Sequence, residues 1–178
     1  LEAAGRLYQH EDWCRQADAV HAAVLEQAFD GAFFVDQAVR EDGALRRTGN
    51  RTEVCQYYAF FFGTATPDSH PGLWATLRDE FGIRRRKTTA HPDIHPANAL
   101  VGNVMRLELL ALYGELELLA GELAEYYAPM ASLTGTLWEN DHPTASCDHG
   151  FASHAAVWLV RDVLGLQYSP EDQSLSLD

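Results

Sequence analysis

The chain has 178 residues, of which 47% are hydrophobic and 22% are charged. This composition is typical of a globular protein and excludes a disordered or collagen-like chain, while the length suits one domain that needs no disulfide or metal to fold. Thirteen Lys and Arg residues against 26 Asp and Glu residues give a net charge of -13. That balance argues against nucleic-acid and anionic-membrane partners, which require clustered positive charge, and no apolar run approaches the roughly 20 residues of a membrane span.

Six helices are predicted from the three- and four-residue spacing of the apolar positions. They cover about residues 13–28, 52–64, 71–81, 97–112, 115–127 and 153–164. Asn50 and Glu53 stand in capping-box spacing at the start of the second helix, and Pro71 suits the first turn of the third. We expect the fifth helix to stop before Pro129, because proline lacks the N–H that a helix interior needs.

The predicted fold class is all-α, because only residues 33–35 suggest a strand. The second, fourth and sixth helices are the more apolar, whereas the third and fifth carry more charge on one side. This alternation is expected of inner and outer helices in a layered array. We interpret residues 1–178 as a single domain and residues 169–178 as a loose tail.

Three connections are long and cover residues 31–51, 82–96 and 128–152. In an up-and-down array these connections emerge at the same end, where the three inner helices begin. Because long loops commonly carry function, the sequence predicts a functional face at this end. The basic run at residues 84–87 lies in the second of these loops and is interpreted as solvated.

The third long loop places Trp138 beside Glu139. An indole face can cover the apolar face of a pyranose, and a carboxylate can activate a water for attack at the anomeric carbon. The alternative, which we weigh equally, is a loop tryptophan packed in the core with a solvated glutamate beside it.

Histidines and cysteines give no metal motif. Five histidines lie in or beside the second and third loops: His91, His95, His142, His149 and His154. His149 and His154 do not share a helical face, and Pro92 disfavours a regular helical pair of His91 with His95. We therefore expect no metal site, and interpret some of these histidines as partners of a hydroxylated ligand or of loop backbone. The three cysteines, Cys14, Cys55 and Cys147, are interpreted as free thiols.

The first long loop contributes Arg51 and Glu53 as candidates for ligand contact. They are favoured over the other polar residues of this loop because they lie where an inner helix begins on the expected functional face. The sequence contains no Gly-rich phosphate loop and neither a G-x-S-x-G nor an H-E-x-x-H motif.

Three segments resemble the last part of the six-hairpin domain of bacterial α-L-rhamnosidases: residues 135–139 (GTLWE), 146–151 (SCDHGF) and 158–165 (WLVRDVLG). Residues 52–67 and 97–114 are similar to inner helices of the same domain. That domain is an (α/α)6 toroid. The resemblance therefore implies that this chain supplies about three of the six hairpins, as the C-terminal half of a catalytic domain.

The resemblance also implies inverting hydrolysis of a terminal rhamnoside by two carboxyl groups without a cofactor. The family's general base falls on Glu139 and its substrate-contacting histidine on His149, while Trp138 would help to wall the sugar pocket. No segment of the chain matches the one that carries the family's general acid. We therefore expect the acid in a missing N-terminal portion, with which this half would associate.

Three other functions stay open. The first is a six-hairpin glycosidase of another sugar specificity, since the motif does not determine which sugar is bound. The second is a non-catalytic helical module that binds a carbohydrate or a protein partner and completes itself as a homodimer. The third is a small metal-dependent hydrolase that uses the loop histidines.

Overall fold

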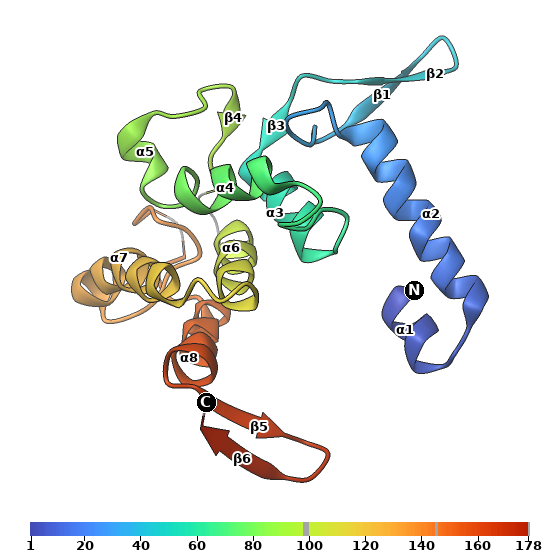
Figure 1. Cartoon of the computed structure of the whole chain (residues 1–178). Coiled ribbons are helices and arrows are strands. Elements are labelled where there is room, and N and C mark those ends of the chain that lie inside the picture. Colours follow the sequence, from blue (N-terminus) through green and yellow to red (C-terminus); the bar gives the residue numbers. More distant parts are fainter. Residues whose placement is uncertain (98–99, 145, 178) are drawn as a thin grey trace. The chain divides into compact units, whose positions relative to one another are not determined.

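The computed structural model describes residues 1–97, 100–144 and 146–177. It is 52% helical and 13% strand with three small sheets, so the all-α prediction is wrong, and nothing in the architecture supports the expected hairpins of an (α/α)6 toroid. The residues cluster into two compact units, whose elements are labelled in Figure 1. Unit 1 comprises Leu1–Glu80 and His91–His95, and unit 2 comprises Phe81–Ala90 and Pro96–Asp178.

Unit 1 is built from four helices and two small sheets. Its helices are α1 (Glu2–Leu7), α2 (Glu11–Ala28), α3 (Glu53–Phe61) and α4 (Pro71–Asp79). Strands β1 (Ala38–Glu41) and β2 (Ala44–Arg47) form an antiparallel hairpin, and β3 (Arg51–Thr52) pairs in parallel with β4 (Ile94–His95). The predicted helices 13–28, 52–64 and 71–81 are therefore present with shorter or shifted ends, whereas the strands of this unit were not predicted.

Helix α3 begins at a different cap from the one expected. The Thr52 hydroxyl, and not Asn50, accepts the hydrogen bond from the Cys55 N–H at 3.1 Å. Tyr57 and Phe60 of this helix are buried, as the apolar sequence predicts. Phe62, just after the helix, is 59% exposed. The apolar run at residues 57–62 is therefore buried at Tyr57 and Phe60 and exposed at its C-terminal end.

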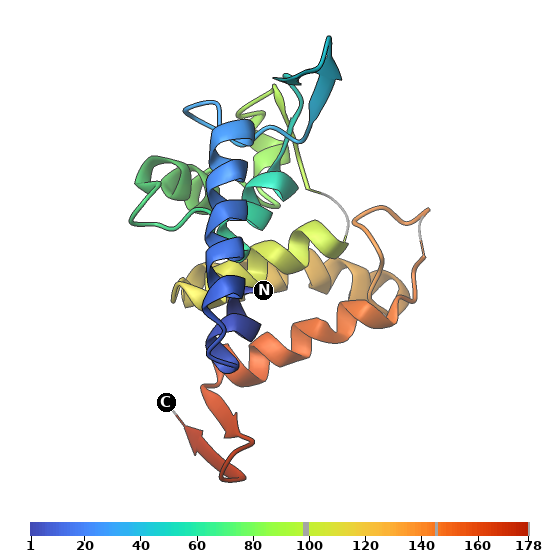
Figure 2. The same ribbon diagram turned by 90° about the vertical axis from the view of Figure 1, so that its right-hand side faces the viewer.

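Unit 2 is built around an antiparallel pair of helices. Its helices are α5 (Arg85–Thr88), α6 (Leu100–Leu112), α7 (Leu116–Thr134), the 3-10 helix η1 (Gly150–His154), α8 (Ala155–Trp158) and the π-helix η2 (Leu159–Val163). The predicted sixth helix thus begins as η1, continues as α8 and ends as η2 (Figure 2). A core cluster joins α6, α7 and α8, and its members include Leu107, Leu119, Tyr127, Trp138 and Trp158.

Helix α7 continues through Pro129, so the end predicted for it is wrong. Proline removes one helical hydrogen bond, a local cost that side-chain burial can outweigh. Tyr126, Tyr127 and Met130 flank the proline and are all buried in the core cluster. The helix therefore continues to Thr134, because the side chains buried on both sides of Pro129 stabilise it by more than the lost hydrogen bond costs.

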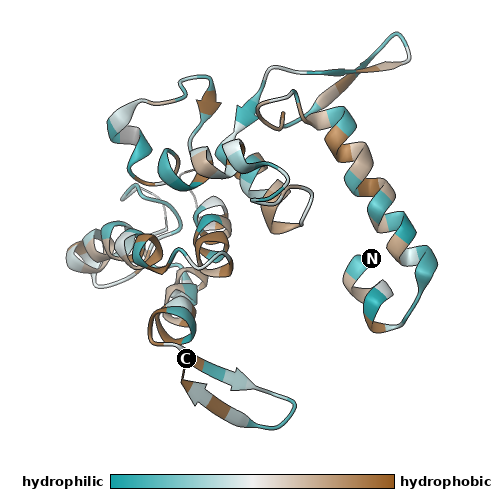
Figure 3. Ribbon diagram, in the orientation of Figure 1, coloured by the Kyte–Doolittle hydropathy of each residue, from teal (hydrophilic) through white to brown (hydrophobic). Residues whose placement is uncertain are grey.

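The last residues are ordered as a hairpin and are not the loose tail that we expected. Strands β5 (Leu166–Ser169) and β6 (Ser174–Leu177) pair antiparallel, with Tyr168 opposite Leu175. Apolar and polar residues alternate along both strands, and Figure 3 shows brown bands between hydrophilic ones along β6. The apolar side chains share one face, because neighbouring residues of a strand point to opposite sides. They are all exposed: Leu166, Tyr168, Leu175 and Leu177.

The basic run is not a solvated loop throughout. Arg84 and Lys87 bind the Glu125 carboxylate at 2.8 and 2.7 Å, which ties α5 to α7. Arg85 is buried, donates to the Ala90 carbonyl and lies 5.1 Å from the centre of the Phe81 ring. The run therefore attaches a short helix to unit 2.

A buried ion pair joins α6 to α7. Arg106 donates from Nε and Nη2 to the two oxygens of Glu122 at 2.7 and 2.6 Å, and the two side chains are 2% and 3% exposed. Gly82 packs against this pair with a φ of +90°, and a Cβ there would lie 2.3 Å from Arg106 Nε. Glycine is thus required at position 82 both by its backbone conformation and by the arginine.

Replacing Arg106 by methionine should destabilise the protein by about 3–5 kcal/mol, because it leaves the Glu122 carboxylate buried without its partner. Urea denaturation followed by circular dichroism measures the change. The double variant Arg106→Met/Glu122→Leu should recover part of the loss. Arg84→Met, which breaks an exposed ion pair of the same unit, serves as the control and should leave the midpoint nearly unchanged. A single variant as stable as the parent would contradict this role of the pair.

Candidate functional site

The five residues that the sequence singles out fall into two groups. Trp138, Glu139 and His149 belong to unit 2, and Arg51 and Glu53 belong to unit 1. The structure therefore brings the first three together in one loop and the last two together at the start of α3. Each group is described within its own unit.

The loop between α7 and η1 is held closed by its own backbone. The Glu139 N–H donates to the Ser146 carbonyl and the His149 N–H donates to the Leu137 carbonyl, both at 2.9 Å. The Thr136 hydroxyl also donates to the Cys147 carbonyl. These bonds pair the two arms of the loop in antiparallel fashion. Glu139 and His149 consequently lie on facing arms with fixed backbones.

Trp138 anchors this loop to the core. Its side chain belongs to the core cluster of unit 2, and the residue is 5% exposed. The indole Nε1 donates to the Thr134 hydroxyl at 2.8 Å, which satisfies its only polar group. This placement corresponds to the alternative interpretation of Trp138 as a core residue. It leaves little indole surface to cover a sugar.

Glu139 and His149 remain accessible beside that anchor. Glu139 is exposed and His149 is half-buried. The His149 ring meets the ring of Phe151 edge to face, with 5.4 Å between centroids. Phe151 is 77% exposed, which is unusual for a large apolar side chain next to a structured loop. The loop thus carries an exposed carboxylate on one arm, and an imidazole in contact with an exposed aromatic ring where the other arm enters η1.

The sequence interpretation missed Phe151. It lies in the segment used for the resemblance, but it precedes a helix whose apolar residues were expected to face inward. The sequence offers no signal for its exposure, because an apolar residue at the start of a helix is ordinarily read as part of the core. An exposed aromatic ring beside polar groups is a common component of carbohydrate and protein binding surfaces.

In unit 1, Arg51 is held by two aspartates. Its Nε donates to Asp30 at 2.9 Å and its Nη1 donates to Asp93 at 2.8 Å. Burial alone would raise the pKa of Asp30, but the N–H groups of Phe33 and Ala32 and the Arg51 guanidinium bind the carboxylate and bring the pKa below its usual value. Arg51 therefore ties the segment after α2 to strands β3 and β4.

Glu53 is fully buried in the first turn of α3. The Tyr57 hydroxyl, one turn later, donates to Glu53 Oε2 at 3.0 Å. Before this turn, the Asp36 carboxylate accepts from both the N–H and the hydroxyl of Thr52 at 3.0 and 2.9 Å. These contacts fix the start of the helix, and they leave the Glu53 carboxylate closed to solvent.

Cys55 lies in the same turn, and its thiol stays protonated at neutral pH. Burial, followed by the nearby Asp36 carboxylate, raises the pKa of the thiol to about 12. The thiol also donates to the Val35 carbonyl at 3.6 Å. A neutral thiol is a poor nucleophile and a poor metal ligand. Cys55 therefore acts as a packing residue of this turn.

Over residues 1–97, 100–144 and 146–177, no group of three or more His, Cys, Asp or Glu side chains is arranged to hold a metal ion. Within the same ranges, no helix combines the length and apolar character that crossing a bilayer requires.

Trp138→Ala should destabilise the protein by about 3–5 kcal/mol, because it removes a large ring from the core and the anchor of the loop. Glu139→Gln is the neighbouring control and should leave the unfolding midpoint unchanged, since the residue is exposed. Thermal and urea unfolding measure both. Equal stability of Trp138→Ala and the parent would show that the indole is not an anchor.

Alkylation of Cys55 by iodoacetamide at pH 8 should be at least roughly tenfold slower in the folded protein than in the same protein unfolded in urea, because only the thiolate reacts. Mass spectrometry of the peptide that contains Cys55 gives both rates. Equal rates would contradict the raised pKa.

Comparisons with protein-family models, with curated proteins and with solved structures find no match for this chain. The resemblance to rhamnosidases therefore rests on the quoted segments alone, and the chemistry of the site has to be argued from the loop of unit 2.

Proposed function

We propose that this chain carries the general base of an inverting glycoside hydrolase that acts on terminal α-L-rhamnosides, and that Glu139 is that base. The observation that carries the proposal is the Glu139 carboxylate itself. It is exposed on a loop whose backbone is pinned on one side by the buried Trp138 and on the other by the hydrogen bond to the Ser146 carbonyl.

A general base must hold a water in line with the anomeric carbon. An accessible carboxylate on a fixed backbone meets this requirement, because both of its oxygens can accept hydrogen bonds from the water. In an inverting enzyme the acid stands about 6.5–9.5 Å away, across the sugar, and protonates the leaving oxygen. We assign the acid to a second carboxyl group outside this loop.

The neighbours of Glu139 suit a sugar ring. His149 can bond to a ring hydroxyl, which both donates and accepts. The exposed Phe151 ring can cover the apolar C–H face of the pyranose, the task that the sequence suggested for Trp138. Arg51 and Glu53 receive no role in this proposal, since both are engaged within unit 1.

The assignment is tested by the hydrolysis of p-nitrophenyl α-L-rhamnoside by the natural protein that contains this chain. Glu139→Gln should lower kcat by at least about 100-fold, because the amide cannot take a proton from water. Glu171→Gln, which replaces an exposed glutamate in the β5–β6 turn, is the matched control and should keep full activity. Full activity in Glu139→Gln would show that Glu139 is not the base.

Chemical rescue sharpens this test. In Glu139→Ala, azide can enter the space of the lost carboxylate and its water, attack the anomeric carbon and displace the aglycone. The product should be β-L-rhamnosyl azide, with the configuration inverted. A panel of other aryl glycosides, assayed with the same variants, shows whether the sugar is rhamnose or another pyranose.

A further inference from the structure

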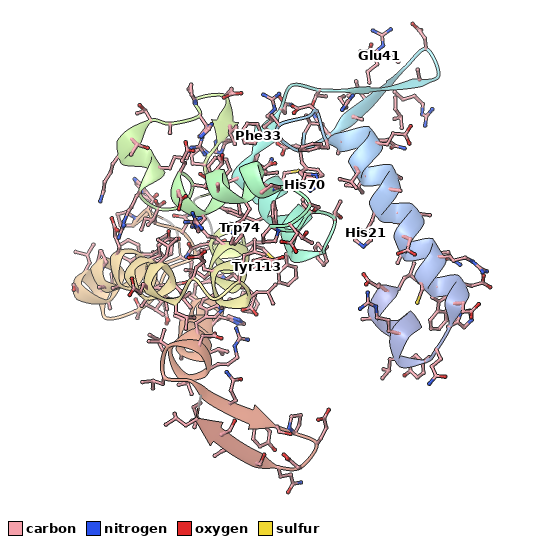
Figure 4. All side chains as sticks on the ribbon, viewed as in Figure 1. His21, Phe33, Glu41, His70, Trp74 and Tyr113 are labelled. Carbon is pink, nitrogen blue, oxygen red and sulfur yellow. The ribbon has the colours of Figure 1, made fainter. Side chains whose placement is uncertain are left out.

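Unit 1 contains a cleft that the proposed hydrolase does not use. Its volume is about 470 Å³, and it lies between the segment after α2 and the start of α4. This volume falls within the range of small-ligand sites. The residues that matter for its chemistry are Phe29, Phe33, Ser69, His70, Gly72 and Thr76, of which Phe33 and His70 are labelled in Figure 4.

Two phenylalanines give the cleft its apolar surface. Phe29 and Phe33 both line the cleft and are half-buried, and the Phe33 ring also meets the His91 ring, with 5.7 Å between centroids. The ring of Phe29 is also packed against the His70 ring, with 4.9 Å between centroids and an angle of 90°. This contact fixes the imidazole in one orientation beside the apolar wall.

The polar side chains of the cleft are held in place by hydrogen bonds to one another. His70 Nδ1 shares a hydrogen bond with the Ser69 hydroxyl at 2.8 Å, and that hydroxyl also accepts from the Thr66 N–H at 2.9 Å. For His70 Nε2, the described part of the chain provides no hydrogen-bond partner. Whichever tautomer the Ser69 contact selects, Nε2 is left either to donate or to accept.

A hydroxyl group fits this arrangement better than an anion does. A hydroxyl can both donate and accept, so it pairs with Nε2 in either tautomer, whereas a carboxylate only accepts. The lining contains no Asp, Glu, Lys or Arg side chain. The net charge of -13 also disfavours anionic ligands. The cleft is therefore suited to a neutral ligand that has both hydroxyl groups and an apolar face.

At Gly72 the first turn of α4 contributes only backbone to the wall of the cleft, whereas Leu73 and Thr76 also line it. A Cβ built at Gly72 meets no atom within 4 Å, so this position of the helix faces open space. A larger side chain at Gly72 would enter the cleft without striking the protein. The glycine is therefore a place where the cleft can be filled while the helix is retained.

We propose that this cleft is a binding site for a neutral pyranose, whose C–H face packs on Phe29 and Phe33 and whose hydroxyl bonds to His70 Nε2. The lining has no carboxylate that could act as acid or base, so the site binds sugar without cleaving it. The proposal does not depend on Glu139 or on hydrolysis.

The test is a titration of the ¹⁵N-labelled chain with L-rhamnose, D-glucose, D-galactose and D-mannose, each followed by amide chemical shifts. At least one sugar should shift the amides of Ala32, Gly72 and Leu73 in a saturable manner, with a Kd on the order of 1 mM. Gly72→Leu fills the cleft, and His70→Phe keeps the ring contact but removes the nitrogens. Each should weaken binding at least roughly tenfold, which is the loss expected for a buried hydrogen bond or a blocked pocket.

The control is Ala75→Leu, which enlarges an exposed residue of α4 that does not line the cleft, and which should bind as the parent does. The dispersion of the amide spectrum shows that each variant is folded. The absence of shifts at the cleft with all four sugars overturns the proposal, and so does binding at the cleft that both Gly72→Leu and His70→Phe leave intact. Shifts confined to His149 and Phe151 would overturn it while leaving the hydrolase proposal standing. Binding at the cleft together with full activity of Glu139→Gln would support the cleft proposal and overturn the hydrolase proposal.

Discussion

The ion pair between Arg106 and Glu122 is the constraint on which unit 2 depends. Two fully desolvated charges are tolerable only when their geometry is close to ideal, and here both carboxylate oxygens are bound by one guanidinium. This requirement fixes the rotation and the register of α6 against α7. It also fixes the turn at Gly82, which has no side chain because the guanidinium occupies that space. The rest of the core then packs around two helices that can meet in only one way.

The candidate catalytic loop follows from that register. The loop starts where α7 ends, and Trp138 reaches back into the core that α6 and α7 create. An aromatic ring in a core is a rigid anchor, since it has few rotamers and many contacts. The residue after it, Glu139, is therefore placed by the core although its own side chain faces solvent. Chemistry at a loop depends on such remote support, because a loosely held carboxylate cannot orient a water.

The sequence predicted helices well where one apolar face is buried, as in α4 and α6, because burial imposes a helical period on the residues. It failed where packing between elements outweighs the local conformational preference of the residues. Pro129 forbids a helix locally, but Tyr126 and Met130 need to be buried on either side of it. Strands β1 and β2 were missed because they are exposed on both faces and carry no inward alternation. Trp138 and Glu139 were found from their chemistry, but only the structure separates the buried anchor from the exposed carboxylate. Phe151 was overlooked because exposure cannot be read from residue type.

The β5–β6 hairpin has a consequence for how the molecule opens. It exposes the four large apolar side chains of one face, and a two-stranded hairpin has no inner layer of its own. The hairpin buries little apolar surface against η2. Its backbone hydrogen bonds should therefore open without disturbing α6 and α7. Opening of the chain then follows a hierarchy, in which the amides of the hairpin exchange with solvent on a short timescale and those around Arg106 exchange only when unit 2 unfolds as a whole. The same hierarchy leaves the hairpin more open to proteolysis than α6 and α7.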